Sequence, residues 1–267
     1  MNYRSSQSIK TAYIENLGCA KNQVDAEIML EALKRSGVAH CVEPAEADII
    51  FINSCGFIES AKTESLETAL GYKRTFPEKK VVMSGCLSQR YSDELFDSMQ
   101  ELEGIVGNGA PHRIPEIIAD LELGKRIRFL PERANGQWNR GWFFSSPNSV
   151  YVKIAEGCDN RCSFCAIPII RGPLRSRNPD EIITEIEWLI GKGVFEINII
   201  AQDLGSYGID RGGPQLTELL ERALRIQGRF WIRMLYIHPD NFPDNLLELC
   251  RNDARLLPYF DIPFQHA

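Results

Sequence analysis

The sequence has no long hydrophobic run. Its longest mostly apolar stretches, such as residues 197–201, have the length of a strand, whereas a membrane helix needs about 20 apolar residues. The first ten residues, MNYRSSQSIK, lack the apolar segment of a secretory signal peptide. We therefore expect a cytoplasmic protein with no membrane partner.

The sequence also has no excess of positive charge. Its 30 lysine and arginine residues are outnumbered by 36 aspartate and glutamate residues, which gives a net charge of −6. Proteins that bind nucleic acids usually carry a basic surface, so the composition disfavours a nucleic acid as the direct substrate. An acidic protein attracts basic partners instead. The length of 267 residues and the 44% hydrophobic content suit a globular chain of one or two domains.

Cysteine is plentiful, with eight residues, and a reducing compartment disfavours disulfides between them. Three of them, Cys158, Cys162 and Cys165, lie in the loop EGCDNRCSFCAIP directly after a predicted strand. We call them the loop cysteines. Three thiolates can bind three irons of a 4Fe–4S cube and leave the fourth iron open for S-adenosylmethionine (SAM). Structural zinc prefers four ligands, and no fourth cysteine or histidine lies nearby in the sequence.

A second set of cysteines, Cys19, Cys55 and Cys86, lies far apart in the sequence. We call them the sheet-edge cysteines because each ends a predicted strand, in YIENLGC, IIFINSC and VVMSGC. The carboxyl ends of parallel strands meet at one edge of a sheet, where ligands bind. These residues therefore predict a second cluster site. The alternative is that they are buried structural thiols, as free cysteines often are.

The order of strand and helix patterns predicts an α/β protein with two domains. Residues 1–125 form a parallel α/β domain, with strands at 11–17, 48–53, 80–84 and 104–106 and helices at 23–36, 57–72, 88–99 and 111–123. Residues 126–149 are predicted to form a linker. Residues 150–267 form a partial (β/α) barrel, with strands at 150–155, 194–201, 230–237 and 259–262 and helices at 179–191, 216–227 and 244–251. Four strands leave an open sheet edge, so we expect the barrel to be C-terminally incomplete.

The motifs NLGCAKNQVDAE, INSCGFI, SGCLSQRY and EGCDNRCSFCAIPIIRGPLRSR resemble the radical SAM methylthiotransferase family. This family inserts a methylthio group into a C–H bond, using two 4Fe–4S clusters and SAM. The resemblance implies that the sheet-edge cysteines hold an auxiliary cluster and that the loop cysteines hold the radical SAM cluster. It also implies that Phe164 lies near the adenine of SAM. The resemblance also implies further barrel strands and a TRAM domain, which we expect to be missing from this chain.

Within this family, LGCAKNQVDAE, IPIIRGPLRSR and AQDLGSYGID look like the ribosomal-protein branch, RimO. That branch modifies the β-carbon of an aspartate in the basic ribosomal protein S-twelve. Ala20 and the pair Leu204–Gly205 depart from its usual pattern. A MiaB-like tRNA methylthiotransferase acting on an adenosine is one alternative, and a non-enzymatic iron–sulfur electron carrier or zinc module is another. A flavodoxin- or ferredoxin-type protein is the expected electron donor.

Several polar residues are further candidates for cofactor binding. Gln202 and Asp203 end the second barrel strand, where the radical SAM superfamily binds the amino group of SAM, although simple loop capping is an alternative role. Arg233 lies on a strand that should line the barrel, where a buried charge needs a partner. We expect these three residues and Phe164 to bind the cofactor. The sequence leaves the role of three arginines open between SAM, an acidic substrate residue, the neighbouring domain and a solvated basic stretch: Arg171, Arg175 and Arg177. Weaker candidates that end later strands are His238, Gln265 and His266. No catalytic acid or base stands out.

Overall fold

The computed structural model describes residues 8–133, 138, 140–144, 146 and 148–264. By its internal contacts the chain divides into two compact units. The first unit takes in the chain up to Trp142 together with the short segment Ile169–Arg171. The second unit contains Phe143–Pro168 and the chain from Gly172 onward. Both units contain parallel β-sheets and helices, which confirms the predicted α/β class.

The described part of the first unit has a parallel sheet of six strands, in the order β2-β1-β3-β4-β5-β6. The strands are β1 (Thr11–Asn16), β2 (Ala39–His40), β3 (Ile49–Ser54), β4 (Lys80–Gly85), β5 (Gly104–Val106) and β6 (Ile127–Phe129). Strand β3 is buried along its whole length, as a central strand should be. The chain changes direction across the sheet between β1 and β3, and open α/β sheets bind ligands beyond the carboxyl ends of the strands at such a point.

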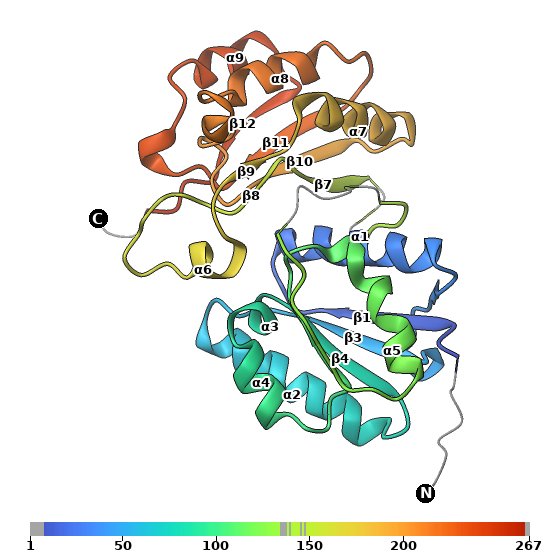
Figure 1. The fold of residues 1–267 in the computed structure, drawn as a ribbon. Helices are drawn as coiled ribbons and strands as arrows, with labels where there is room; N and C mark the ends of the chain where they lie inside the picture. The colour runs from blue at the N-terminus through green and yellow to red at the C-terminus, as the bar shows by residue number, and fades with distance from the viewer. Residues whose placement is uncertain (1–7, 134–137, 139, 145, 147, 265–267) are drawn as a thin grey trace, which may run out of the picture. The chain divides into compact units, whose positions relative to one another are not determined.

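Helices cover both faces of this sheet (Figure 1). On one face lie α1 (Ala20–Arg35), the 3₁₀ helix η2 (Pro111–Ile117) and α5 (Ile118–Glu122). On the other lie α2 (Glu59–Thr75), α3 (Cys86–Arg90) and α4 (Ser92–Ser98), and a short η1 (Pro44–Glu46) precedes β3. Helix α1 buries Ala26, Met29 and Leu33, whose i, i+3, i+7 spacing places them on one helical face.

The structure corrects several predicted elements of the first unit. The helix predicted at 88–99 is two helices, α3 and α4, which are separated at Tyr91. The helix predicted at 111–123 begins as the 3₁₀ helix η2, which contains Pro115, a residue without the N–H that an α-helix needs. Strands β2 and β6 were not predicted because they are too short to show periodicity. Strand β6 lies within residues 126–149, the stretch predicted as a linker.

The described part of the second unit has a parallel sheet of four strands, in the order β12-β11-β10-β7. The strands are β7 (Ser149–Lys153), β10 (Glu196–Ile200), β11 (Trp231–Leu235) and β12 (Leu256–Phe260). Its main helices, α7 (Pro179–Gly191), α8 (Leu216–Leu224) and α9 (Leu246–Asn252), lie together on one face (Figure 1). This open sheet confirms the predicted partial barrel. The described residues form no closed barrel.

The alternating side chains of these strands explain why the helices pack on one face of the sheet. Val152, Ile199 and Met234 are fully buried in the core that the helices share, whereas Asn198 and Arg233 alternate with them along the strands. Helix α7 begins as predicted, because the Asn178 side chain accepts a hydrogen bond from the Asp180 N–H. Strand β12 starts three residues before the strand predicted at 259–262.

A small antiparallel pair, β8 (Ala155–Glu156) and β9 (Arg175–Ser176), was not predicted. It closes the base of the loop that carries the loop cysteines and the short helix α6 (Ile167–Arg171). Two further 3₁₀ helices, η3 (Ile209–Arg211) and η4 (Pro239–Asn241), follow β10 and β11. No helix in the described part of the chain is long and apolar enough to cross a membrane.

Candidate metal and cofactor sites

The sheet-edge cysteines leave the first sheet at its carboxyl edge. Asn16 of β1 pairs in register with Asn53 of β3, which in turn pairs with Ser84 of β4. Cys19 and Cys86 then begin helices, as the N-cap of α1 and the first residue of α3. Cys55 directly follows β3. The topology thus brings these distant thiols to one edge, as the sequence predicted.

The turn between β4 and Cys86 requires a glycine. Gly85 has a φ of +94°, a conformation that residues with a side chain rarely adopt. A Cβ atom there would lie 2.6 Å from the carbonyl oxygen of Ser54. The missing side chain lets the start of α3 pass close to the end of β3, which brings Cys86 toward Cys55.

Asn22 connects two of the sheet-edge cysteines. Its Oδ1 lies 3.7 Å from Cys19 Sγ and 3.4 Å from Cys86 Sγ, and its Nδ2 donates to the carbonyl oxygen of Ser54 at 3.0 Å. The side chain is buried, and it sits in the first turn of α1. From the sequence, Asn22 is expected to begin a helix close to Cys19, and the fold adds its contact with the distant Cys86.

Arg171 contacts the same site. It belongs to the first unit, as part of the segment Ile169–Arg171. Its Nη2 lies 3.2 Å from Cys86 Sγ, 2.9 Å from Asn22 Oδ1 and 3.0 Å from Asp25 Oδ2. The side chains of Arg171 and Asp25 are only 2% and 5% exposed. Burial raises the pKa of the Cys86 thiol, and the positive charge of Arg171 opposes this increase.

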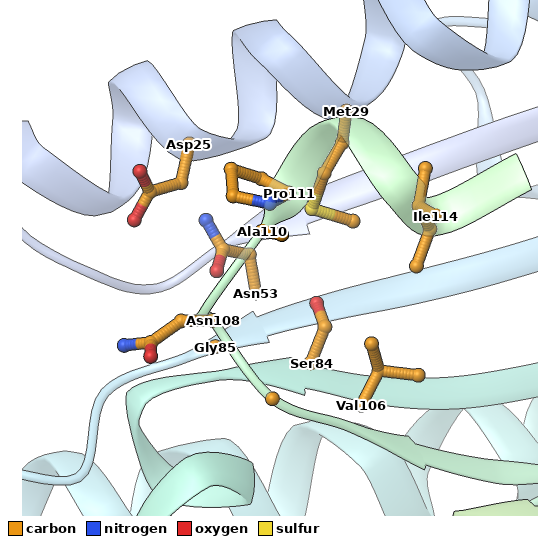
Figure 2. Close-up of a pocket in the computed structure, with 11 residues that line it drawn as sticks. Asp25, Met29, Asn53, Ser84, Gly85, Val106, Asn108, Ala110, Pro111 and Ile114 are labelled. Atoms are coloured by element: carbon orange, nitrogen blue, oxygen red, sulfur yellow. The ribbon is translucent and has the colours of Figure 1, made fainter. Parts of the chain in front are cut away.

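Asn108, in the loop after β5, is a second donor to Cys86. Its Nδ2 lies 3.4 Å from Cys86 Sγ. Figure 2 shows Asn108 together with Asp25 and Asn53 around a pocket between α1 and the sheet, which has room for about one water molecule. The surroundings of Cys86 are therefore polar and closely packed, whereas Cys19 is exposed.

The loop cysteines lie in the second unit on a loop whose base is fixed. The Cys158 N–H donates to the Gly172 carbonyl at 3.1 Å, and the Leu174 N–H donates to Asp159 Oδ1 at 3.1 Å. The Cys165 N–H donates to the Cys162 carbonyl, which forms a tight turn. All three thiols are partly exposed, and Phe164 between them is 60% exposed. Burial raises the pKa of Cys158, with a smaller contribution from the negative charge of Asp203.

Asp203 is buried, and both of its carboxylate oxygens accept hydrogen bonds within the protein. Oδ2 accepts from the side chains of Asn160 at 2.9 Å and Asn241 at 2.6 Å, as well as from Ser206. Oδ1 accepts from the His238 N–H at 3.0 Å. Asn160 belongs to the cysteine loop, so Asp203 ties this loop to the ends of β10 and β11. This geometry favours a positioning role over direct cofactor contact.

Gln202 combines one satisfied and one unsatisfied polar atom. Its Nε2 donates to Glu156 Oε1 at 2.9 Å. Its Oε1 is buried and has no hydrogen-bond partner among the residues that the structure describes. A buried acceptor without a donor is costly, and a bound ligand can supply the donor. The end of β10 therefore suits a ligand with an N–H group, such as the amino group of SAM.

The remaining candidates have protein partners. Arg233 Nε lies 2.6 Å from Glu196 Oε1, and its guanidinium stacks on the ring of Tyr259. Arg177 is buried and donates to the Lys153 carbonyl and to Glu185 Oε2, which ties β7 to α7. Arg175 donates to the Pro173 carbonyl, and His238 caps η4. Gln265 and His266 lie outside the described residues.

Neither set of cysteines converges like the ligands of a single ion. Among the described residues, no three histidine, cysteine, aspartate or glutamate side chains could hold one metal ion together. Ligands of an iron–sulfur cube bind different irons, so they are spaced more widely than the ligands of a single zinc ion. Each unit supplies three thiols, at the carboxyl ends of parallel strands in the first unit and on one loop between β8 and β9 in the second, and this donor set fits such a cube.

Comparison with protein families gives two matches in order along the chain. Residues 11–107 match the family described as "Uncharacterized protein family UPF0004". Residues 152–267 match the "Radical SAM superfamily". The boundary between these two matches falls in the same region as the change from the first to the second unit.

Curated relatives are similar over most of the chain. It is 43% identical to the ribosomal protein uS12 methylthiotransferase RimO of Treponema denticola, over 93% of this chain and 57% of the relative. It is 42% identical to the RimO protein of Syntrophotalea carbinolica, over 94% of this chain and 57% of the relative. The chain thus spans less than two thirds of the length of these relatives.

Among solved structures, the radical SAM methyltransferase TsrM from Kitasatospora setae, with cobalamin and a [4Fe-4S] cluster bound, has a TM-score of 0.63. It is 14% identical, and the match covers 91% of this chain and 59% of TsrM. A likeness at this identity concerns the fold alone. The two matched regions in this order, and the similarity to RimO proteins along nearly the whole chain, show that the chain belongs to the radical SAM methylthiotransferase family.

Proposed function

We propose that this chain is a transferase that adds a methylthio group to the β-carbon of an aspartate in ribosomal protein uS12, by radical SAM chemistry. The observation that carries the proposal is the presence of two separate sets of three thiols, one at the carboxyl ends of parallel strands of the first sheet and one on a single loop between β8 and β9. A two-cluster electron carrier would also have two sets, so reductive cleavage of SAM in the test below separates it from the transferase. The identity of over 40% to RimO proteins supports the ribosomal-protein branch.

In this proposal the sheet-edge cysteines hold an auxiliary 4Fe–4S cluster, and the loop cysteines hold the radical SAM cluster. When bound, the loop cluster and SAM supply the hydrogen abstraction that opens the substrate C–H bond to sulfur insertion. The chain's part is to bind and orient the cofactor and the substrate, and to exclude side reactions. We expect a flavodoxin- or ferredoxin-type protein to donate electrons, and a cytoplasmic location.

The described side chains take distinct roles toward SAM. Gln202 Oε1 accepts a hydrogen bond from the amino group of SAM, which supplies its missing donor. Phe164 offers an exposed ring to the adenine. Arg233, held by Glu196, offers its remaining N–H groups to a carboxylate of the cofactor. Asp203 positions the cysteine loop through Asn160.

The test is a competition between substrates under strictly anaerobic conditions. The reconstituted chain is incubated with SAM, reductant and sulfide, together with either a peptide that spans the modified aspartate of uS12 or a tRNA. Mass spectrometry should show a methylthio group in place of hydrogen on the peptide and no change in the tRNA. Modification of the tRNA alone would favour the MiaB-like alternative. SAM that stays intact under strong reductant would refute the radical mechanism altogether.

A further inference from the structure

Cys86 differs from the other two sheet-edge cysteines in the donors that surround its sulfur. Arg171 Nη2 and Asn108 Nδ2 lie 3.2 and 3.4 Å from Cys86 Sγ. In the part of the chain that the structure describes, no nitrogen donor contacts the sulfur of Cys19 or Cys55. Cys86 is also buried, so water screens these interactions little.

We propose that Arg171 and Asn108 set the reduction potential of the auxiliary cluster through the Cys86 sulfur. This inference rests on the proposed function, because it requires a cluster on the sheet-edge cysteines. Reduction adds negative charge to a cluster and its thiolates. N–H groups that donate to a thiolate stabilise the reduced state, and a nearby positive charge does the same, so both raise the potential.

The guanidinium of Arg171 is held in a fixed orientation. The ion pair with Asp25 at 3.0 Å and the hydrogen bond to Asn22 Oδ1 at 2.9 Å both use Nη2, the atom that faces Cys86. Asp25 thus positions the donor, and its negative charge also offsets part of the positive charge of Arg171. Arg171 and Asp25 should therefore shift the potential in opposite directions.

The experiment uses the full chain with Cys158, Cys162 and Cys165 replaced by alanine, so that only the auxiliary cluster assembles. The potential is measured by anaerobic redox titration, with the electron paramagnetic resonance signal of the reduced cluster as the readout. Arg171→Gln and Asn108→Ala should each make the potential more negative, and Asp25→Asn should make it more positive. The matched control is Arg113→Gln, because Arg113 is partly exposed and pairs with Glu116 away from the cysteines.

Arg171→Gln removes a partner of the buried Asp25 carboxylate and can impair folding. The double variant Arg171→Gln/Asp25→Asn removes both charges together. Its potential should shift from the parent in the negative direction, by a smaller amount than the potential of Arg171→Gln. If Arg171→Gln assembles no cluster, Asn108→Ala and the double variant decide the question. Potentials unchanged from the parent in these variants would overturn the inference alone. Failure of the parent itself to assemble a cluster would overturn the proposed auxiliary cluster as well.

Discussion

At the scale of single residues, the buried Oε1 of Gln202 is an acceptor that lacks a donor among the described residues, so a ligand N–H group would stabilise it. We predict that Gln202→Ala weakens SAM binding about tenfold, which corresponds to the roughly 1.4 kcal/mol of one hydrogen bond. Equilibrium binding of SAM to the anaerobically reconstituted chain measures the effect. Gln227→Ala, in an exposed loop after α8, is the control. Equal affinities for the two variants would contradict the assignment of Gln202.

Asp203 leads to a different prediction, because both of its carboxylate oxygens already accept hydrogen bonds within the protein. Asp203→Asn replaces one accepting oxygen with an NH₂ group that faces donors, and this should destabilise the second unit by about 1–3 kcal/mol. It should also release Asn160 and loosen the cysteine loop. In the apoprotein, alkylation of Cys158 should then be faster, as measured by mass spectrometry. Cys86, in the other unit, serves as the internal reference. An unchanged rate at Cys158 would show that Asp203 does not position the loop.

At the scale of elements, the strand-to-helix turns determine where the sheet-edge cysteines lie. We predict that Gly85→Ala costs clearly more stability than Gly124→Ala, measured by urea denaturation. Both glycines have positive φ, so a side chain strains the backbone in both variants, by about 1–3 kcal/mol. Only at Gly85 would the new Cβ also meet the Ser54 carbonyl, whereas nothing lies within 4 Å of it at Gly124. Equal losses would mean that the turn relaxes freely.

The elements that the sequence failed to predict are short or depend on distant partners. Strands β2 and β6 and the pair β8 and β9 contain two or three residues each, too few for a periodic pattern. Each exists because a neighbouring strand supplies its hydrogen bonds. The longer elements, such as α1 and α7, were predicted close to their observed bounds because their apolar periodicity and caps are local signals.

At the scale of the whole molecule, the two sets of cysteines should act as independent cluster sites. We predict about eight irons per reconstituted chain, and about four after alanine replaces either the sheet-edge or the loop cysteines. Iron and sulfide analysis measures this. Cys250→Ala, which removes a partly buried thiol at the edge of the second core, should keep about eight irons. If about eight irons remain after one set of cysteines has been replaced, the two-site assignment is refuted.

The sequence by itself determined the α/β class, the two sets of cysteines and the family, because spacing and strand periodicity are local properties of the chain. Tertiary structure decided which polar groups surround those cysteines. Arg171 lies 85 residues from Cys86 in the sequence, and the sequence left its role open between SAM, substrate and another domain. Asp203 accepts hydrogen bonds from three separate segments, which the sequence could not show. Hydrogen bonds and buried ion pairs depend on distances between segments, and only the folded chain fixes those distances.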